Sequence, residues 1–176
     1  MLTAEYSKLV LQFKRPAGTS RGVLHDKPTY FIKVWNTHNP GVVGMGECST
    51  IVNLSIDHRE GYEDMLQQVC YRINDLPDLA NWPSIKFGVE MALLDLQNGG
   101  RGILFPSKFT EGTAAIPING LIWMGNEGFM QEQVQEKLAQ GFNCIKMKIG
   151  AIDFDKELSI LQSIRSNYGK DKIELR

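Results

Sequence analysis

The 176-residue sequence lacks any apolar run that approaches the roughly 18 residues of a membrane span. It also lacks an N-terminal basic segment followed by an apolar stretch, which argues against a secretory signal. Neither sign of charge dominates, because nineteen Lys and Arg residues stand against twenty Asp and Glu residues without forming blocks. This balance argues against nucleic acid or a membrane surface as a main partner.

Cysteine and histidine are scarce, with three of each, and none of them has the spacing of a metal site: Cys48, Cys70, Cys144, His25, His38 and His58. The absence of a CxxC pair predicts a reducing, cytoplasmic location and no structural zinc. We expect the histidines to be surface or turn residues rather than metal ligands.

The first half of the sequence has the pattern of strands followed by helices. Three β-rich runs cover residues 6–14, 30–36 and 41–48, and they predict an antiparallel meander. Residues 15–22 contain a proline, two glycines, hydroxyls and two arginines, and we expect them to form a mobile, polar loop.

Two helices follow the strands. Apolar residues at helical spacing predict one helix over residues 57–74. The second begins at Trp82-Pro83-Ser84, with Ser84 as the expected N-cap, and ends at Asn98-Gly99-Gly100. Its sequence is apolar nearly all round, which predicts burial between two layers.

The pattern changes at residue 114. Strands are predicted over 116–123, 143–150 and 172–176, with helices over 127–140 and 154–167 between them. This alternation is typical of right-handed parallel crossovers. We therefore expect two domains, 1–113 and 114–176, the first α+β and the second α/β. Because the sequence stops inside its third parallel strand, we also expect a C-terminus that is cut short.

Two lysines on the predicted strand 143–150 are the strongest chemical signal. Lys146 and Lys148 share a face with Cys144, while isoleucine and methionine side chains occupy the other face. A second ammonium nearby disfavours the charged form of a lysine, so such a pair can supply a general base for a weak carbon acid. On spacing alone, a solvated pair at a sheet edge is the more frequent case.

The order of elements resembles the enolase superfamily, whose members pair an α+β capping domain with a modified (β/α) barrel. Within it the likeness is to the o-succinylbenzoate synthase family of menaquinone biosynthesis. Four segments carry the resemblance: GMGE at 44–47, FGVEMALLDL at 87–96, PINGLI at 117–122 and IKMKIG at 145–150.

The resemblance implies a capping domain at 1–113 and the first βα units of a TIM-type barrel at 114–176. It implies a lyase that converts a small carboxylate, a succinyl-substituted hydroxycyclohexadiene carboxylate, to o-succinylbenzoate by syn dehydration. Lys148 would take the proton alpha to the carboxylate and return it to the departing hydroxyl. Lys146 would favour the neutral form of Lys148 and contact the carboxylate.

The resemblance also implies residues outside the lysine strand. Thr19, Ser20 and Arg21 would hydrogen-bond the succinyl carboxylate, although an exposed loop is an equally good interpretation of each. Mg²⁺ or Mn²⁺ would be the cofactor. Its ligands, and a lysine on the opposite side of the site, are expected beyond Arg176, so we expect the 176 residues alone to be inactive.

Several alternatives stay open. The chain resembles dipeptide epimerases, N-succinylamino acid racemases and muconate-type cycloisomerases of the same superfamily, and a non-catalytic capping-type binding module is a further alternative. Glu47 suits a structural hydrogen-bonding role better than an acid. Trp123 suits a packed core better than a pocket wall.

Overall fold

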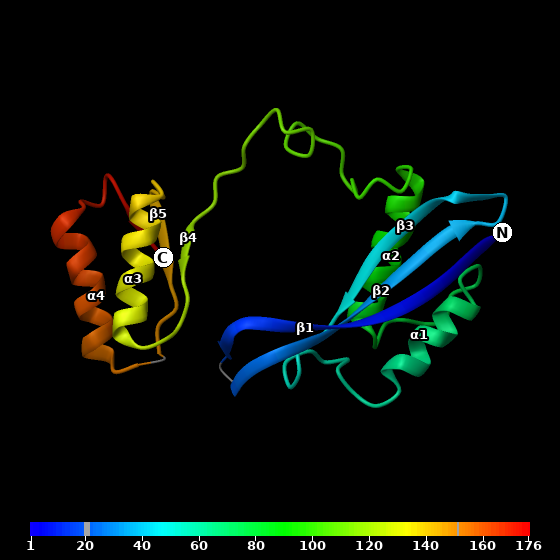
Figure 1. The fold of residues 1–176 in the computed structure, drawn as a ribbon, viewed down its shortest axis with the longest axis horizontal. Coiled ribbons are helices and arrows are strands. Elements are labelled where there is room, and N and C mark those ends of the chain that lie inside the picture. The colour runs from blue at the N-terminus through cyan, green and yellow to red at the C-terminus, as the bar shows by residue number, and fades with distance from the viewer. Residues whose placement is uncertain (20–21, 151) are drawn as a thin grey trace. The chain divides into compact units, whose positions relative to one another are not determined.

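The computed structural model describes residues 1–19, 22–150 and 152–176. The chain divides into two compact units, Met1–Thr113 and Ala114–Arg176. Within these described ranges, the first unit contains three strands and two helices, and the second contains alternating strands and helices (Figure 1). No helix in the described ranges is long and apolar enough to cross a membrane.

The first unit is built on an antiparallel meander of β1 (Leu2–Thr19), β2 (Gly22–Asn36) and β3 (Asn39–Ser49), in the order β1-β2-β3. Burial alternates along β2, where Tyr30, Ile32 and Val34 lie in the core. Alternation of this kind is expected where one face of a sheet is covered and the other is not. The predicted meander is confirmed.

The loop predicted over 15–22 is wrong for the residues that the structure describes, because residues 15–19 continue β1 and Gly22 begins β2; residues 20 and 21 lie outside the described residues. Pairing between β1 and β2 breaks after Gln12↔Asp26 and resumes at Ala17↔Leu24. The irregularity contains Pro16, which has no N–H to give to a strand ladder and is tolerated at such bulges. The turn-forming residues thus mark a bulge in β1 rather than a loop between strands.

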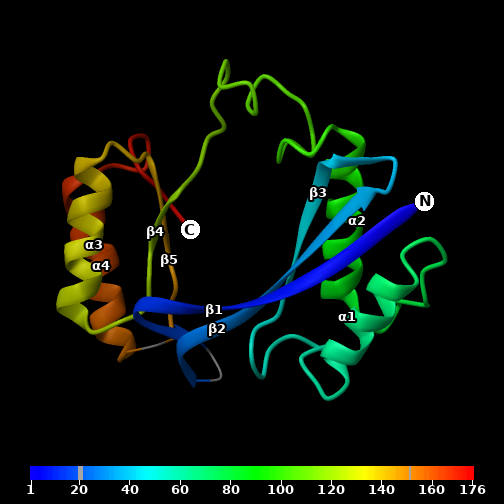
Figure 2. The same ribbon diagram turned by 45° about the vertical axis from the view of Figure 1, so that its right-hand side comes forward.

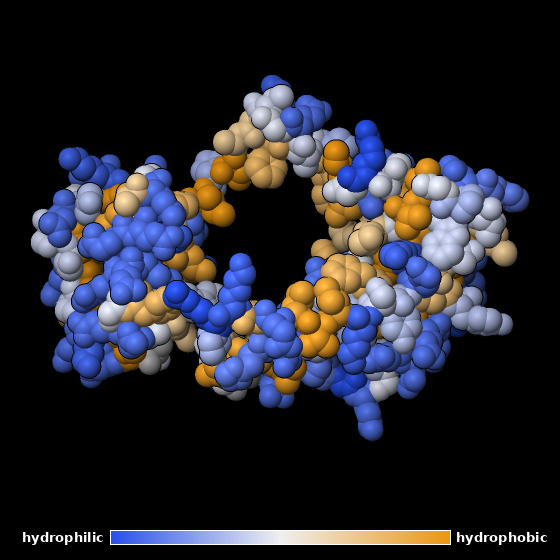
Figure 3. Space-filling model, in the orientation of Figure 1, coloured by the Kyte–Doolittle hydropathy of each residue, from blue (hydrophilic) through white to orange (hydrophobic). Residues whose placement is uncertain are grey.

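The hairpin extends past the end of β3, which pairs with β2 only as far as Thr29↔Ser49. Several apolar side chains of the β1–β2 hairpin are exposed: Leu9, Val10, Leu11, Phe13 and Val23. Figure 3 shows apolar surface over this hairpin.

The helices of the first unit are α1 (Tyr62–Tyr71) and α2 (Pro83–Gln97), and both contribute to the core of the meander. The first is shorter than predicted because Gly61, at φ 79°, is its N-cap. The N-cap of α2 is Trp82, with Pro83 in the first turn, so the assignment to Ser84 is wrong. Proline is favoured at that position because the first helical N–H needs no partner.

Glycines let α2 lie directly on β3. A Cβ at Gly46 would stand 1.8 Å from the Gly88 carbonyl oxygen, and one at Gly44 would stand 2.0 Å from the Ala92 carbonyl oxygen. Only one side of α2 is covered, since Phe87 is 56% exposed. The predicted burial all round this helix is therefore wrong.

The second unit is a parallel sheet in the order β4-β5-β6, formed by β4 (Gly120–Ile122), β5 (Cys144–Met147) and β6 (Glu174–Leu175). Helices α3 (Glu127–Ala139) and α4 (Phe154–Asn167) connect the strands. Both helices cover the same face of the sheet (Figures 1 and 2). The prediction of a meander with helices followed by parallel βα units is confirmed.

The first strand of this sheet is shorter than predicted. Of the expected residues 116–123, only Gly120–Ile122 pair with β5. Ile116 and Ile118 are 58% and 74% exposed. In the described part of the chain, residues 116–119 have no neighbouring strand with which to form backbone hydrogen bonds. Their hydrophobic pattern alone therefore does not make them a β-strand.

Candidate active site

The two lysines lie on the face of the sheet that the helices leave uncovered. Ile145 and Met147 of β5 are buried in the core formed with α3 and α4, whereas Lys146 between them is exposed. Lys148 is the first residue after β5 and is also exposed. Ile149, predicted to share the buried face, is exposed because the strand has ended. Both lysines thus stand at the C-terminal end of a parallel strand, where (β/α) barrels place their chemistry.

Lys148 lies over an aromatic ring of the neighbouring strand end. Its Nζ is 4.5 Å from the centroid of Trp123, the residue that follows β4. The parallel register sets Ile122 opposite Met147, so the next residues of the two strands become neighbours. Trp123 is half-buried and does not belong to the core cluster. The expectation that it packs in the core is wrong.

The Gln133 side chain holds the backbone of Trp123. Its Oε1 accepts a hydrogen bond from the Trp123 N–H at 2.9 Å, and its Nε2 donates to the Trp123 carbonyl at 3.0 Å. The amide of this α3 residue therefore pairs with Trp123 as a neighbouring strand would. Strand-like pairing ties the end of β4 to α3.

A buried carboxylate holds the segment that follows Lys148. Glu157 of α4 is 2% exposed, and its two carboxylate oxygens accept the Gly150 N–H at 2.8 and 2.9 Å. The Ile152 N–H lies 3.4 Å from the same carboxylate. Charge-assisted bonds to backbone N–H groups are stronger than neutral ones, so this contact restrains the chain two residues beyond Lys148.

The neighbouring strand adds charges of both signs. The register Cys144↔Glu174 puts Glu174 beside the lysine strand, and the Arg176 Nε donates to the Glu174 carboxylate at 2.8 Å. This hydrogen bond raises the pKa of the Arg176 guanidinium. The face that carries Lys146 is therefore polar along β5 and β6.

Of the three residues of the first unit that are predicted to bind substrate, the structure describes Thr19. The Thr19 hydroxyl donates to the Gly22 carbonyl at 2.8 Å across the end of the hairpin. Ser20 and Arg21 lie outside the described residues.

Glu47 has hydrogen-bonding partners within its own sheet. The Thr29 hydroxyl donates to its carboxylate at 2.6 Å, and the Lys27 ammonium lies 3.6 Å away. The hydrogen bond from Thr29 is the main reason that the pKa of Glu47 is lowered, with Lys27 adding to it. These contacts agree with the structural role expected of Glu47.

The described residues do not fit a divalent metal ion. Among them, no group of three or more His, Cys, Asp and Glu side chains is arranged to hold one. His58, for example, has its Nδ1 3.2 Å from the Thr50 hydroxyl.

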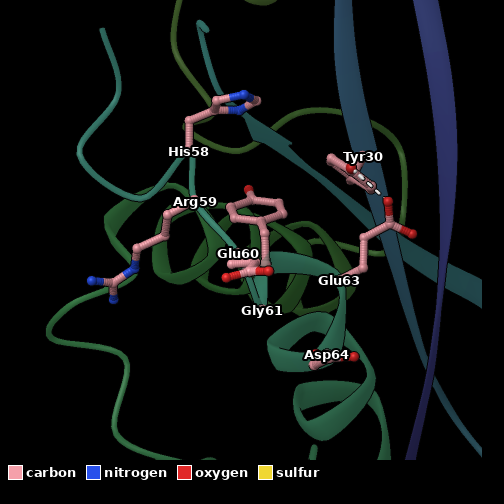
Figure 4. Close-up of a pocket in the computed structure, with 8 residues that line it drawn as sticks. Tyr30, His58, Arg59, Glu60, Gly61, Glu63 and Asp64 are labelled. Carbon is pink, nitrogen blue, oxygen red and sulfur yellow. Dashed lines mark hydrogen bonds between the residues drawn. The ribbon is translucent and has the colours of Figure 1, made fainter. Parts of the chain in front are cut away.

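The first unit also has a surface cavity of about 430 Å³ around the start of α1 (Figure 4). There the Tyr30 hydroxyl donates to the Glu63 carboxylate at 2.9 Å, and Lys8 pairs with the same carboxylate at 2.8 Å. The pKa of Glu63 is lowered by these hydrogen bonds, the one from Lys8 first. Neither Lys146 nor Lys148 lines this cavity.

Comparison with known proteins finds relatives that match nearly the whole chain. The o-succinylbenzoate synthase of Desulfotalea psychrophila is 42% identical over 97% of this chain and 55% of its own length. The crystal structure of MenC from the same organism matches 99% of this chain and 56% of that protein, at 33% identity and a TM-score of 0.79. The resemblance to the enolase superfamily is confirmed.

More distant structures share the fold. The o-succinylbenzoate synthase of Thermosynechococcus elongatus, complexed with Mg in its active site, is 20% identical with a TM-score of 0.72, over 99% of this chain and 51% of that one. The L-Ala-D/L-Glu epimerase of Bacillus subtilis is 18% identical with a TM-score of 0.63, over 98% and 51%. No family model matches the sequence. The chain spans about half the length of the curated relative that it matches.

Proposed function

We propose that this chain is part of an o-succinylbenzoate synthase and that Lys148 is the general base of the reaction. The observation that carries the proposal is the position of Lys146 and Lys148 on the uncovered face at the C-terminal end of β5. The 42% identity to an o-succinylbenzoate synthase supports this activity over the other members of the superfamily. The epimerase, at 18% identity, supports the fold alone.

In the proposed reaction the Lys148 amine takes the proton alpha to the substrate carboxylate. The electron pair of the broken C–H bond is delocalised onto that carboxylate. The same ammonium then gives its proton to the hydroxyl, the C–O bond breaks, and water leaves from the same face. A new C=C bond forms and the ring becomes aromatic. We propose that Lys146 contacts the substrate carboxylate, for which a lysine ammonium is a suitable partner.

The remaining proposals concern the whole enzyme. Mg²⁺ is its proposed cofactor, in keeping with the Thermosynechococcus relative, with Mn²⁺ as a second candidate. We propose that its ligands are residues other than those described here and that the 176 residues alone do not catalyse. Thr19, Ser20 and Arg21 remain proposed substrate contacts. We propose that residues 1–113 are the capping domain and residues 114–176 the barrel portion, in a cytoplasmic enzyme.

The two lysine roles can be tested separately in the protein at the length that its gene encodes, with formation of the aromatic product as the readout. Lys148→Ala should lower kcat by about 100-fold or more, the usual contribution of a general base. Lys148→Arg should fail equally, because a guanidinium keeps the charge but cannot accept a proton. Lys146→Arg keeps the charge and should retain more activity than Lys148→Arg.

Lys156→Ala is the matched control, since Lys156 is an exposed lysine on α4 in the same unit. It should leave turnover unchanged. Turnover by Lys148→Ala within about tenfold of the parent would contradict the assignment of the base. Loss of all product formation in the control as well would show that the assay reports folding rather than chemistry.

A further inference from the structure

The contact between Lys148 and Trp123 distinguishes the two lysines from each other. An ammonium within about 6 Å of a tryptophan ring is attracted by the negative face of the ring. The Lys148 Nζ meets this condition at 4.5 Å. Lys146 is paired in register with Leu121, which has no ring to offer. Of the two lysines, Lys148 is the one that the neighbouring strand end holds by this contact.

The backbone of Trp123 is itself restrained. Both backbone hydrogen-bonding groups of Trp123 are taken by the Gln133 side chain, which also donates to the Phe129 carbonyl at 3.2 Å. A side-chain amide that serves two backbone groups of one residue fixes the direction in which that residue leaves its strand. The backbone from which the ring projects is therefore held by α3, and the side chain itself is half-buried.

The chain around Lys148 is restrained from the other side. The Glu157 carboxylate accepts the Gly150 N–H with both oxygens, and it does so from α4. Gln133 and Glu157 thus hold the two strand ends that bring the indole and the ammonium together. An amine at the tip of a four-carbon side chain is otherwise free to sample many rotamers, which costs entropy when one geometry is required.

We propose that Trp123 is a positioning residue for Lys148: its indole face holds the end of the Lys148 side chain beside the ends of β4 and β5, where the substrate would present its acidic C–H group. This inference deepens the proposed function and rests on it, because positioning matters to the reaction only if Lys148 is the base. Gln133 supports the arrangement through Trp123 and has no direct part in the chemistry.

The contact can be measured without substrate, by competitive labelling of lysines with trace acetic anhydride and mass spectrometry of the peptides. The reagent must reach the amine, and the contact with Trp123 holds the Lys148 Nζ against the face of the ring. Trp123→Leu should therefore raise the labelling rate of Lys148 about two- to fivefold, the factor expected from the loss of an exposed cation–π contact. Lys146, on the same strand, serves as the internal reference, and Trp123→Phe should give a smaller rise.

The kinetic consequence is read in the protein at its full encoded length. Trp123→Leu should lower kcat on the order of tenfold with a smaller change in KM, because misplacing a reacting group acts on the chemical step. Trp123→Phe keeps a ring face and should recover most of kcat. Phe142→Leu is the matched control, since Lys137 lies over the Phe142 ring at 5.9 Å in the same unit. It should change neither the labelling of Lys148 nor kcat.

The outcomes separate this inference from the proposed function. Labelling of Lys148 that is the same in Trp123→Leu as in the parent would overturn the inference. So would faster labelling with an unaltered kcat, or a kcat loss in Trp123→Leu that Trp123→Phe does not recover. Turnover by Lys148→Ala would instead refute the proposed function, and the labelling result would still decide whether the ring holds the amine.

Discussion

The contact between β3 and α2 gives a sharp prediction about stability. Replacing Gly46 by alanine adds a Cβ that would stand 1.8 Å from the Gly88 carbonyl oxygen and 2.8 Å from the Ala92 nitrogen. Both neighbours are backbone atoms, so no side chain can rotate out of the way. Relief requires α2 to move off β3, and with it the buried Val89 and Ala92.

The expected magnitude follows from the cost of overpacking, which is typically 1–3 kcal/mol and occasionally more. Because the clash is with backbone, we expect Gly46→Ala to lower the free energy of unfolding by about 3 kcal/mol. Gly41→Ala is the matched control on the same strand, since its Cβ would meet nothing within 4 Å. It should be neutral or stabilise by up to about 1 kcal/mol, by reducing the freedom of the unfolded chain.

Urea unfolding followed by tryptophan fluorescence measures both variants, because Trp35 and Trp82 lie in the first unit. With a slope of about 1–3 kcal/mol per molar urea, Gly46→Ala should lower the midpoint by about 1–3 M. A Trp123→Phe background removes the signal of the second unit. If the midpoints of Gly46→Ala and Gly41→Ala agree within error, α2 does not lie on β3 as closely as described, and the reasoning fails.

Two further predictions concern ionisation in the first unit. The hydrogen bond from Thr29 lowers the pKa of Glu47, so its stabilisation is full above the ordinary glutamate pKa of about 4.3 and is lost as the pH falls through the lower, folded value. Thr29→Val should therefore cost stability at neutral pH, and the difference from the parent should shrink below about pH 4 in unfolding curves; a gap that does not depend on pH would contradict this. Burial raises the pKa of the Cys48 thiol to about 12 and that of Cys70 to about 11. Iodoacetamide near pH 8 should accordingly spare Cys48 in the folded protein and modify it after unfolding in urea, as peptide mass spectrometry would show; equal rates in both states would refute the burial of Cys48.

Elements with local signals were the easiest to predict. The helix predicted over 154–167 has the bounds of α4, and its start also carries a local signal that the prediction did not use, because the Asp153 side chain caps it. The helix α3 is capped in the same way by Asn126, whose side chain accepts the Phe129 N–H. Such caps involve residues within three positions of the helix start, so the sequence contains them in full.

Elements that depend on distant partners were predicted less well. Residues 116–119 have an apolar pattern, but only Gly120–Ile122 find a neighbour in β5. The bulge of β1 looks like a loop in sequence because proline and glycine are found both in loops and in β-bulges. What decides between them is the pairing of Ala17 with Leu24, which the local sequence does not encode.

The candidate site likewise contains features that the local sequence predicts and contacts that depend on distant residues. Alternation along the strand predicted the shared face of Lys146 and Lys148, but not the two side chains that hold the neighbouring segments. Gln133 has no signal, because a glutamine on a polar helix reads like any solvated residue. Glu157 had one: it precedes Ile160 and Ile164 at helical spacing, so a carboxylate stands on the apolar stripe of α4. A charge in such a position needs buried donors, and the Gly150 N–H is one of them.

The segments that carry the family resemblance therefore differ in what they say about chemistry. Gly44, Gly46 and Gly88 are explained in full by the close approach of β3 to α2, and any protein with this helix on this strand would need them. Lys146 and Lys148 have no such explanation, because they are exposed and fill no space in the core. The glycines are evidence for the fold and the lysines for the reaction. The Gly46→Ala variant therefore tests the fold. The reaction is tested by variants of Lys146, Lys148 and Trp123.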